Sequence, residues 1–251
     1  MFISLRRNVV LRRASVCAEA TPRKRVKRIR QHLNPLSESA SRPASLEAGW
    51  FAAAFDDPTL PLTVDVGCAL GGWVCEAAAA DPSRNFLGLE IRPAAIEAAR
   101  AKLDKLGGAG NAHFLKANAN VDLRRILADA MGPIERVLFQ FPDPHFKKKH
   151  HKRRVVNVEL VDALADALAP DAVVYLASDV LEAADHMRAE FRAHPAFAED
   201  TLDVDSDGWC RESPLEHPTE RERAVLRGAG TTSTEPGHVF RALFSRRGAW
   251  I

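Results

Sequence analysis

Three acidic residues stand at the ends of short apolar segments, where each could face a ligand. Asp65 lies one residue before the end of its segment, Glu90 ends the next one, and Asp143 follows a later one by two residues. Prolines on both sides of Asp143 restrict its backbone, so its carboxylate is presented rigidly. In a doubly wound sheet, ligands bind at the carboxyl ends of the strands. We therefore expect the three carboxylates to lie along one ligand-binding edge.

The turn after the first of these segments is rich in glycine, reading DVGCALGG from Asp65. Glycine lets the backbone approach a ligand because it has no Cβ. Glu90 follows 23 residues after Gly67, where an acid accepts hydrogen bonds from a ribose. Ala69 stands where a dinucleotide fingerprint has its second glycine, and Asp65 would repel a pyrophosphate but attract a sulfonium and an amine. The pattern favours S-adenosylmethionine over a dinucleotide, although such a turn often binds nothing.

A dense cationic block, Lys147–Arg154, follows Asp143 and reads KKKHHKRR. A run of positive charge is usually just a solvated surface. Here the run follows closely after Asp143, whose backbone two prolines restrict at the predicted ligand edge. A purely structural role does not explain why an acid and a basic run stand together at this place. The combination indicates a phosphate-bearing substrate beside a catalytic carboxylate. A second block, Arg23–Arg30, points to the same kind of partner.

Alternating strand and helix patterns predict the fold that positions these residues. Predicted strands cover 62–66, 85–90, 113–116, 136–141, 172–177 and 238–245, and predicted helices cover 72–80, 93–106, 121–131, 157–168 and 181–192. This alternation is typical of an α/β protein with a parallel, doubly wound sheet. Asn118 or Asn120, after the third strand, could bond an adenine edge or could equally cap a helix. We expect one domain at 24–251, preceded by a basic arm at 1–23.

The composition fits one globular domain, since 46% of the 251 residues are hydrophobic and 27% are charged. The apolar runs are too short to span a bilayer, so we expect a soluble protein without a membrane partner. The four cysteines are Cys17, Cys68, Cys75 and Cys210. They contain no C-x-x-C pair, so we expect a reducing compartment and no metal site. The first twenty residues are rich in arginine with Glu19 as their one acid, which is typical of an organelle transit peptide or of a basic arm that holds RNA.

The chain resembles the tRNA (guanine-N7)-methyltransferases over roughly residues 24–247. The resemblance is carried by FPDP at 141–144 with KKKHHKRR at 147–154, by DVGCALG at 65–71, by NFLGLEIR at 85–92 and by RIRQHLNPL at 28–36. The GCA form of the glycine turn and the RQHLNPL segment are similar to the cyanobacterial and plastid branch. This implies a Rossmann-like, S-adenosylmethionine-dependent enzyme that methylates N7 of a guanosine at position 46 in the tRNA variable loop. The branch suggests a chloroplast, with the mitochondrion or cytoplasm as alternatives.

The resemblance also implies roles for individual residues. Asp143 would be the catalytic residue. Contacts to S-adenosylmethionine would come from Asp65, Gly67, Gly71, Glu90, Arg92, Asn118 and Ala119, and contacts to the tRNA substrate from Lys147, Asp179, Thr219 and Glu222. His145 stands where the family commonly has tryptophan, and Gly228–Gly237 is an insertion without an evident role. We expect tRNA as the partner of a monomer or homodimer.

Two other classes of protein make different demands on these motifs. A non-catalytic RNA-binding protein with this fold would not need to keep Asp65, Glu90 and Asp143 together. A small-molecule methyltransferase or a dehydrogenase would have no use for KKKHHKRR. Binding of labelled S-adenosylmethionine separates the first class from an enzyme.

Overall fold

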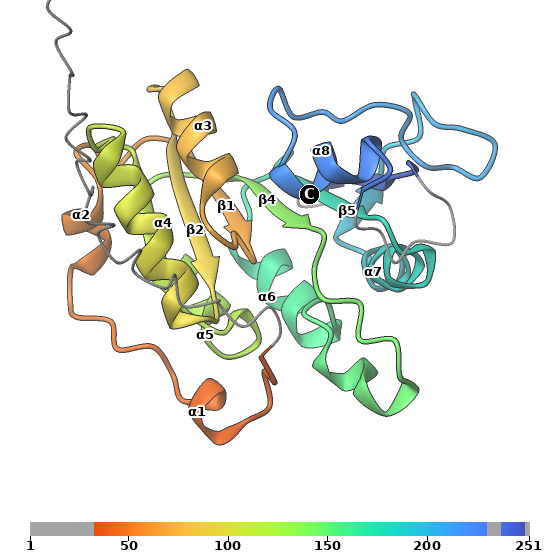
Figure 1. The fold of residues 1–251 in the computed structure, drawn as a ribbon, viewed down its shortest axis with the longest axis horizontal. Helices are drawn as coiled ribbons and strands as arrows, with labels where there is room; N and C mark the ends of the chain where they lie inside the picture. The colour runs from red at the N-terminus through yellow and green to blue at the C-terminus, as the bar shows by residue number, and fades with distance from the viewer. Residues whose placement is uncertain (1–32, 230–236, 249–251) are drawn as a thin grey trace, which may run out of the picture.

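Short segments rich in valine, leucine and phenylalanine form a seven-stranded sheet in the computed structural model, which describes residues 33–229 and 237–248 (Figure 1). The strands are β1 (Leu62–Val66), β2 (Asn85–Glu90), β3 (Ala112–Lys116), β4 (Ile134–Gln140), β5 (Val173–Ser178), β6 (Phe197–Glu199) and β7 (Phe240–Arg246). Their order across the sheet is β3-β2-β1-β4-β5-β7-β6. Every residue of β1 and β2 is buried, as expected of parallel strands that are covered on both faces.

Helices cover both faces of the sheet. They are α1 (Glu38–Ser41), α2 (Trp50–Ala54), α3 (Gly72–Ala80), α4 (Pro93–Lys105), α5 (Ala119–Ala128), α6 (Val158–Ala167), α7 (Leu181–Ala193) and α8 (Glu220–Leu226), with the 3-10 helix η1 (Lys148–Arg153). Apolar side chains of α5, α6 and α7 pack into one buried cluster, and those of α3, α4 and α8 pack into a second. The predicted α/β doubly wound fold is therefore confirmed.

The prediction of a wholly parallel sheet is wrong at one edge. The first five strands pair in parallel, but β7 is antiparallel to both β5 and β6. After α7 the chain forms the short strand β6 and then reverses its direction, so that β7 runs antiparallel to β5 and β6. Helix and strand periodicity report burial but carry no strand direction, and for that reason the sequence did not reveal this reversal.

A segment of the chain before the first strand crosses the start of α5, and we call residues 34–44 the strap. Asp122, which is fully buried, accepts a hydrogen bond from the backbone N–H of Ala44 at 2.9 Å. Arg125 donates to the carbonyl of Ala44 at 2.7 Å and to Asp122 at 2.7 Å. These bonds fix the strap against the helix that follows β3.

The predicted arm at 1–23, the block Arg23–Arg30 and most of Gly228–Gly237 lie outside the described residues. Within the described ranges, no helix combines the length and the apolar character needed to cross a bilayer.

Candidate active site

The carboxyl ends of the central strands meet at one edge, where backbone hydrogen bonds hold the loops that follow them. Cys68 N–H donates to the Leu89 carbonyl at 3.0 Å, which joins the loop after β1 to the end of strand β2. Phe141 N–H donates to the Ala177 carbonyl at 2.8 Å, which joins the loop after β4 to the end of strand β5. The predicted acids Asp65, Glu90 and Asp143 therefore lie at or just after the ends of the neighbouring strands β1, β2 and β4, as the parallel arrangement requires.

Asp65, at the end of β1, is a buried carboxylate with 4% of its surface exposed. Gln140 donates to it from the neighbouring strand at 3.3 Å. Burial raises the pKa of Asp65 to about 7, opposed by the Gln140 hydrogen bond and reinforced by the charge of Glu90. A carboxylate in this state gains stability from a nearby cation, because the cation compensates the cost of burying its charge.

Glu90, at the end of β2, is held by Arg92 through both carboxylate oxygens. Arg92 donates from its backbone N–H at 2.9 Å and from Nε at 3.1 Å to Oε1, and from Nη2 to Oε2 at 2.9 Å. The pKa of Arg92 is raised, mainly by Glu90 and in part by the charge of Asp143. Arg92 therefore links the predicted ribose-binding acid electrostatically to the predicted catalytic acid.

The glycine turn after β1 contains one open glycine and one packed glycine. Gly67 has φ +88°, and apart from its chain neighbours no atom of residues 33–229 or 237–248 lies within 4 Å of the position that a Cβ would take. Gly71 has φ +69°, and a Cβ there would lie 2.5 Å from Cζ of Phe114 and 2.7 Å from Cβ of Ala99. Gly67 thus leaves room beside the backbone for a ligand, whereas Gly71 allows the turn to pack against β3 and α4.

Asn118 caps α5 and also holds the strap. Its side-chain oxygen accepts from the backbone N–H of Asn120 at 3.2 Å, and its amide nitrogen donates to the carbonyls of Pro35 and Ala40, both at 3.0 Å. Both amide hydrogens are thus used within the protein, so a bond from them to an adenine would require the strap to move. The cofactor roles of Asn118 and of Ala119, which begins α5, stay predictions.

The loop that carries Asp143 leaves the sheet in an uncommon backbone conformation. Phe141 has φ +52° and His145 has φ +48°, values that residues with a side chain rarely adopt. His145 N–H donates to Oδ1 of Asp143 at 3.3 Å, and Nδ1 of the same histidine lies 3.8 Å from that oxygen. Strain of this kind on both sides of an acid is typical of functional loops. Asp143 also lines a small cleft that α7 closes.

The cationic block divides into exposed and buried members. Lys147, Lys148, Lys149 and Lys152 are exposed around η1, which projects at the lower right of Figure 1 in green. Arg154, in contrast, has 7% of its surface exposed. Phe146 is 51% exposed between Asp143 and Lys147. An aromatic residue beside a basic run is the sequence signal for Phe146, whereas no sequence signal separates the buried Arg154 from its exposed neighbours.

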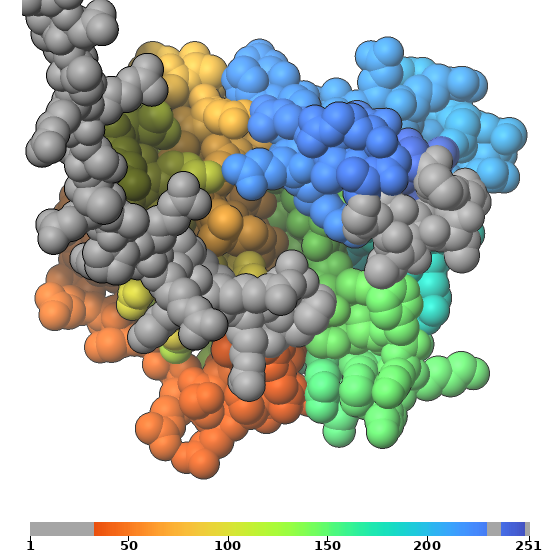
Figure 2. Space-filling view, in the orientation of Figure 1, coloured from red at the N-terminus to blue at the C-terminus, as the bar shows by residue number. Residues whose placement is uncertain are grey.

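Asp179 follows β5, and α8 lies opposite it. Arg221 donates from Nη2 to Oδ2 of Asp179 at 2.6 Å, and Asp179 is 4% exposed. The helix itself lies against α3, which follows the glycine turn, because Arg223 pairs with Glu76 of α3 at 2.6 Å. Figure 2 shows α8, in blue, side by side with α3, in gold. The late sequence motif is thereby brought to the same edge as the glycine turn.

Comparison with known proteins identifies the family. A family model described as "Putative methyltransferase" matches residues 59–234. A tRNA (guanine-N(7)-)-methyltransferase of Thermosynechococcus vestitus is 44% identical over 201 residues, which cover 80% of this chain and 90% of that protein. Another, of Trichormus variabilis, is 43% identical over 222 residues, which cover 87% and 96%. The chain belongs to the tRNA (guanine-N7)-methyltransferase family. The crystal structure of the 16S rRNA methyltransferase KamB has a TM-score of 0.52 at 15% identity, covers 82% of this chain and 97% of that one, and so shares its fold.

Two residues of the methyltransferase predicted to bind substrate have structural partners. Thr219 caps α8 by accepting from the Glu222 N–H at 3.0 Å. Glu222 is 1% exposed, and its Oε1 accepts from Nη2 of Arg241 at 2.7 Å and from Nε at 3.2 Å. The contacts of Thr219 and Glu222 with substrate stay predictions, whereas the structure shows that Thr219 caps α8 and that Glu222 holds this helix to β7 through Arg241.

Replacing Arg241 with methionine is expected to destabilise the methyltransferase by about 3–5 kcal/mol, because Glu222 would be left as a buried charge without its cation. The measurement is the free energy of unfolding in urea. A double variant, Glu222→Gln with Arg241→Met, should recover most of the loss. Equal stability of the Arg241→Met variant and the wild type would contradict the assignment.

The described cysteines of this methyltransferase are Cys68, Cys75 and Cys210, and all three are free thiols. Within the described ranges, no three histidine, cysteine or acidic side chains gather to form a metal site. The predicted absence of a metal stays a prediction.

Proposed function

We propose that this chain transfers a methyl group from S-adenosylmethionine to N7 of a guanosine in tRNA, at position 46 of the variable loop. The proposal is supported by relatives named as tRNA (guanine-N(7)-)-methyltransferases that match nearly their whole length. The observation that carries it is the placement of Asp143, on a strained loop between the acids of the cofactor edge and an exposed run of lysines.

The residues at the edge fit S-adenosylmethionine. Gly67 leaves space beside the backbone, and Asp65 is a buried carboxylate that a cation would stabilise. Glu90, oriented by Arg92, would accept hydrogen bonds from the ribose hydroxyls. When bound, S-adenosylmethionine supplies a methyl group that a lone pair can attack.

In this proposal Asp143 binds and stabilises the guanine and does not remove a proton from the nucleophile. Guanine N7 carries an unprotonated lone pair at neutral pH, so no general base is needed. The carboxylate of Asp143 would accept hydrogen bonds from N1–H and the exocyclic amino group, and would stabilise the positive charge that develops on the purine. Asp179, on the adjacent strand end, would share this task. Holding N7 in line with the methyl group can supply up to about 7–11 kcal/mol of the barrier reduction.

The exposed lysines around η1 would follow the tRNA backbone. If the four exposed lysines contact phosphates, the logarithm of the association constant should fall with the logarithm of salt concentration at a slope of about −3 to −4. Replacing Lys148 and Lys152 with methionine should flatten the slope by about 1.5–2, as measured by filter binding across a salt series. Arg124→Gln, at an exposed ion pair with Asp166, is the control and should leave the slope unchanged. An unaltered slope in the double lysine variant would exclude this surface as the phosphate contact.

We further propose that the protein acts in a chloroplast. The Arg-rich first twenty residues and the similarity to cyanobacterial relatives support this location. Microscopy of the full chain fused to a fluorescent protein tests it, and signal confined to mitochondria or cytoplasm would contradict it.

The test of the activity is transfer of tritiated methyl from S-adenosylmethionine to a tRNA transcript with guanosine at position 46. The matched substrate is the same transcript with adenosine at that position. We expect the first transcript to be labelled and the second to stay unlabelled, whereas equal labelling would contradict the proposed site.

A further inference from the structure

Arg154 belongs to the cationic block in the sequence but is not on its surface. It has 7% of its surface exposed, whereas the four lysines of the same block are exposed. A buried guanidinium costs free energy unless several acceptors compensate it. Its contacts therefore indicate what it does.

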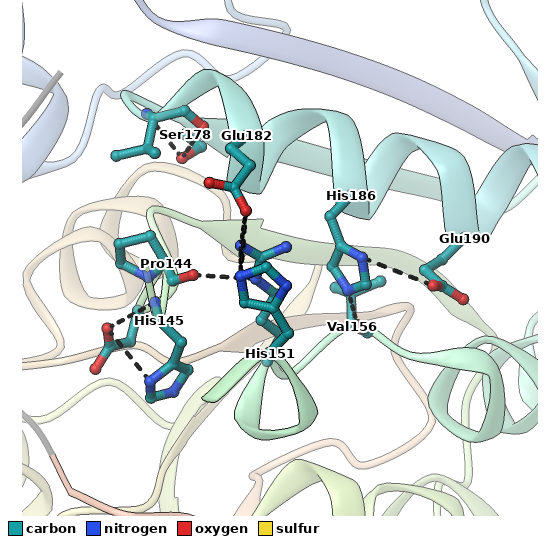
Figure 3. Close-up of polar contacts among 11 residues, drawn as sticks. Pro144, His145, His151, Val156, Ser178, Glu182, His186 and Glu190 are labelled. Atoms are coloured by element: carbon teal, nitrogen blue, oxygen red, sulfur yellow. Dashed lines mark hydrogen bonds and ion pairs between the residues drawn. The ribbon is translucent and has the colours of Figure 1, made fainter. Parts of the chain in front are cut away.

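Arg154 bridges the loop of Asp143 to the first turn of α7. Its Nε donates to the carbonyl of Pro144 at 3.0 Å, and its Nη2 donates to Oε1 of Glu182 at 2.8 Å. His151 lies 3.2 Å from the same Nη2 through its Nε2. In Figure 3 the labelled residues Pro144, His151 and Glu182 converge beneath α7, and dashed lines mark these contacts. The planar guanidinium of arginine has five donors and can bind acceptors in several directions at once. The ammonium group of lysine, on a flexible stem, holds several acceptors less well.

The backbone of Arg154 is fixed as well. Its N–H donates to the carbonyl of His151 at 2.9 Å, and its carbonyl accepts from Nδ2 of Asn120, in the first turn of α5, at 3.3 Å. Arg154 thus connects η1, α5 and α7 to the carbonyl of Pro144, the residue after Asp143.

The loop of Asp143 needs such an anchor because both of its ends have positive φ. The entry, at Phe141, is held to the sheet by the bond to the Ala177 carbonyl. Near the exit, beside His145, Arg154 holds the loop by donating to the carbonyl of Pro144. A strained backbone persists only when its surroundings hold it.

We propose that Arg154 is a positioning residue for methyl transfer, which holds Asp143 against the target guanine through the Pro144 carbonyl and is itself held by Glu182. The inference rests on the proposed function. A misplacement of about 1 Å can cost about 100-fold in rate, so loss of this anchor should act on kcat. The exposed lysines, in contrast, should act on tRNA affinity.

The variants are Arg154→Lys and Glu182→Gln, with Lys152→Met as the phosphate-contact comparison and Glu190→Gln as the neutral control on the same helix α7. Glu190 faces His186 at 3.7 Å and does not contact the loop. Arg154→Lys should lower kcat by about 100-fold and Glu182→Gln by about 10-fold, with the Kd for tRNA and for S-adenosylmethionine within about twofold of wild type. Lys152→Met should weaken tRNA binding with kcat preserved, and Glu190→Gln should match wild type.

A second readout reports on the loop without catalysis. In hydrogen–deuterium exchange of the protein without substrate, peptides containing Asp143 to Lys147 should exchange faster in Arg154→Lys and Glu182→Gln than in Glu190→Gln. If Arg154→Lys does not fold, Glu182→Gln carries the test, because Glu182 is half-exposed on its helix.

Wild-type kcat in a folded Arg154→Lys variant would overturn the proposal. So would a weaker Kd for tRNA with preserved kcat, because Arg154 would then be a phosphate ligand. Failure of the wild-type protein to methylate tRNA would instead contradict the proposed function, and the exchange measurement would still decide whether Arg154 holds the loop.

Discussion

Replacing Asp143 with asparagine is expected to lower kcat by about 100- to 1,000-fold while the Kd for S-adenosylmethionine stays within about twofold of wild type. The side chain keeps its size, but it loses its charge and presents an amide N–H where the guanine presents its own donors. The loss should fall on the transition state, because the purine gains positive charge only as the methyl group moves. Single-turnover kinetics with saturating tRNA, together with calorimetry of cofactor binding, provides the measurement.

Asp166→Asn is the matched control for this experiment. Asp166 lies in the last turn of α6, where it is exposed and pairs with Arg124 of α5. It should leave kcat and the cofactor Kd unchanged. Near-wild-type turnover of Asp143→Asn would remove Asp143 from the reaction.

The affinity for S-adenosylmethionine is expected to weaken about tenfold for each pH unit below about 7. The pKa of Asp65 is raised to about 7, so in the free protein this carboxylate is protonated below that pH. Binding of a cation requires the ionised form, and below the pKa it must therefore release one proton. Calorimetry between pH 5 and pH 8, in buffers of different ionisation enthalpy, measures both the Kd and the released proton.

The raised pKa of Asp65 also predicts that the stability of the free protein falls as pH rises, whereas the affinity for S-adenosylmethionine increases. The folded state keeps a proton on Asp65 that the unfolded state releases above about pH 4, so this group lowers stability as pH rises from about 4 to 7 and has no further effect above that. Asp65→Asn mimics the protonated form. It should bind cofactor weakly without this pH dependence, and it should be more stable than wild type at pH 8. A wild-type Kd that stays constant from pH 5 to pH 8 would contradict the role of Asp65.

Much of the sheet was predictable because the central strands are buried on both faces. The segments 62–66 and 85–90 are mostly apolar, and their predicted bounds agree with β1 and β2. The predicted helix 121–131 begins later than the observed helix α5, because the cap of this helix, Asn118, stands before the apolar pattern begins. The short elements α8 and β6 carry too few residues to show a period, although α8 positions the Arg221 partner of Asp179.

The candidate site was predictable where a residue acts alone and unpredictable where it acts through a distant partner. Asp65, Glu90 and Asp143 follow strand ends, and parallel topology brings strand ends together. Asn118 donates hydrogen bonds to two carbonyls of the strap, in residues that are 78 and 83 positions away in the sequence. The burial of Arg154 likewise depends on the packing of α7 against the block. Charge alone placed Arg154 with the exposed lysines, because a sequence pattern does not show which of six cations turns inward.

The most direct test is analysis of the nucleoside that the wild-type protein makes. A tRNA transcript with guanosine at position 46 is incubated with the protein and S-adenosylmethionine, digested to nucleosides and analysed by mass spectrometry against synthetic standards. The account predicts 7-methylguanosine as the methylated product, in amounts approaching one per tRNA. A methyl group on another atom of guanine, on another base or on the ribose, or no methylated nucleoside at all, would contradict it.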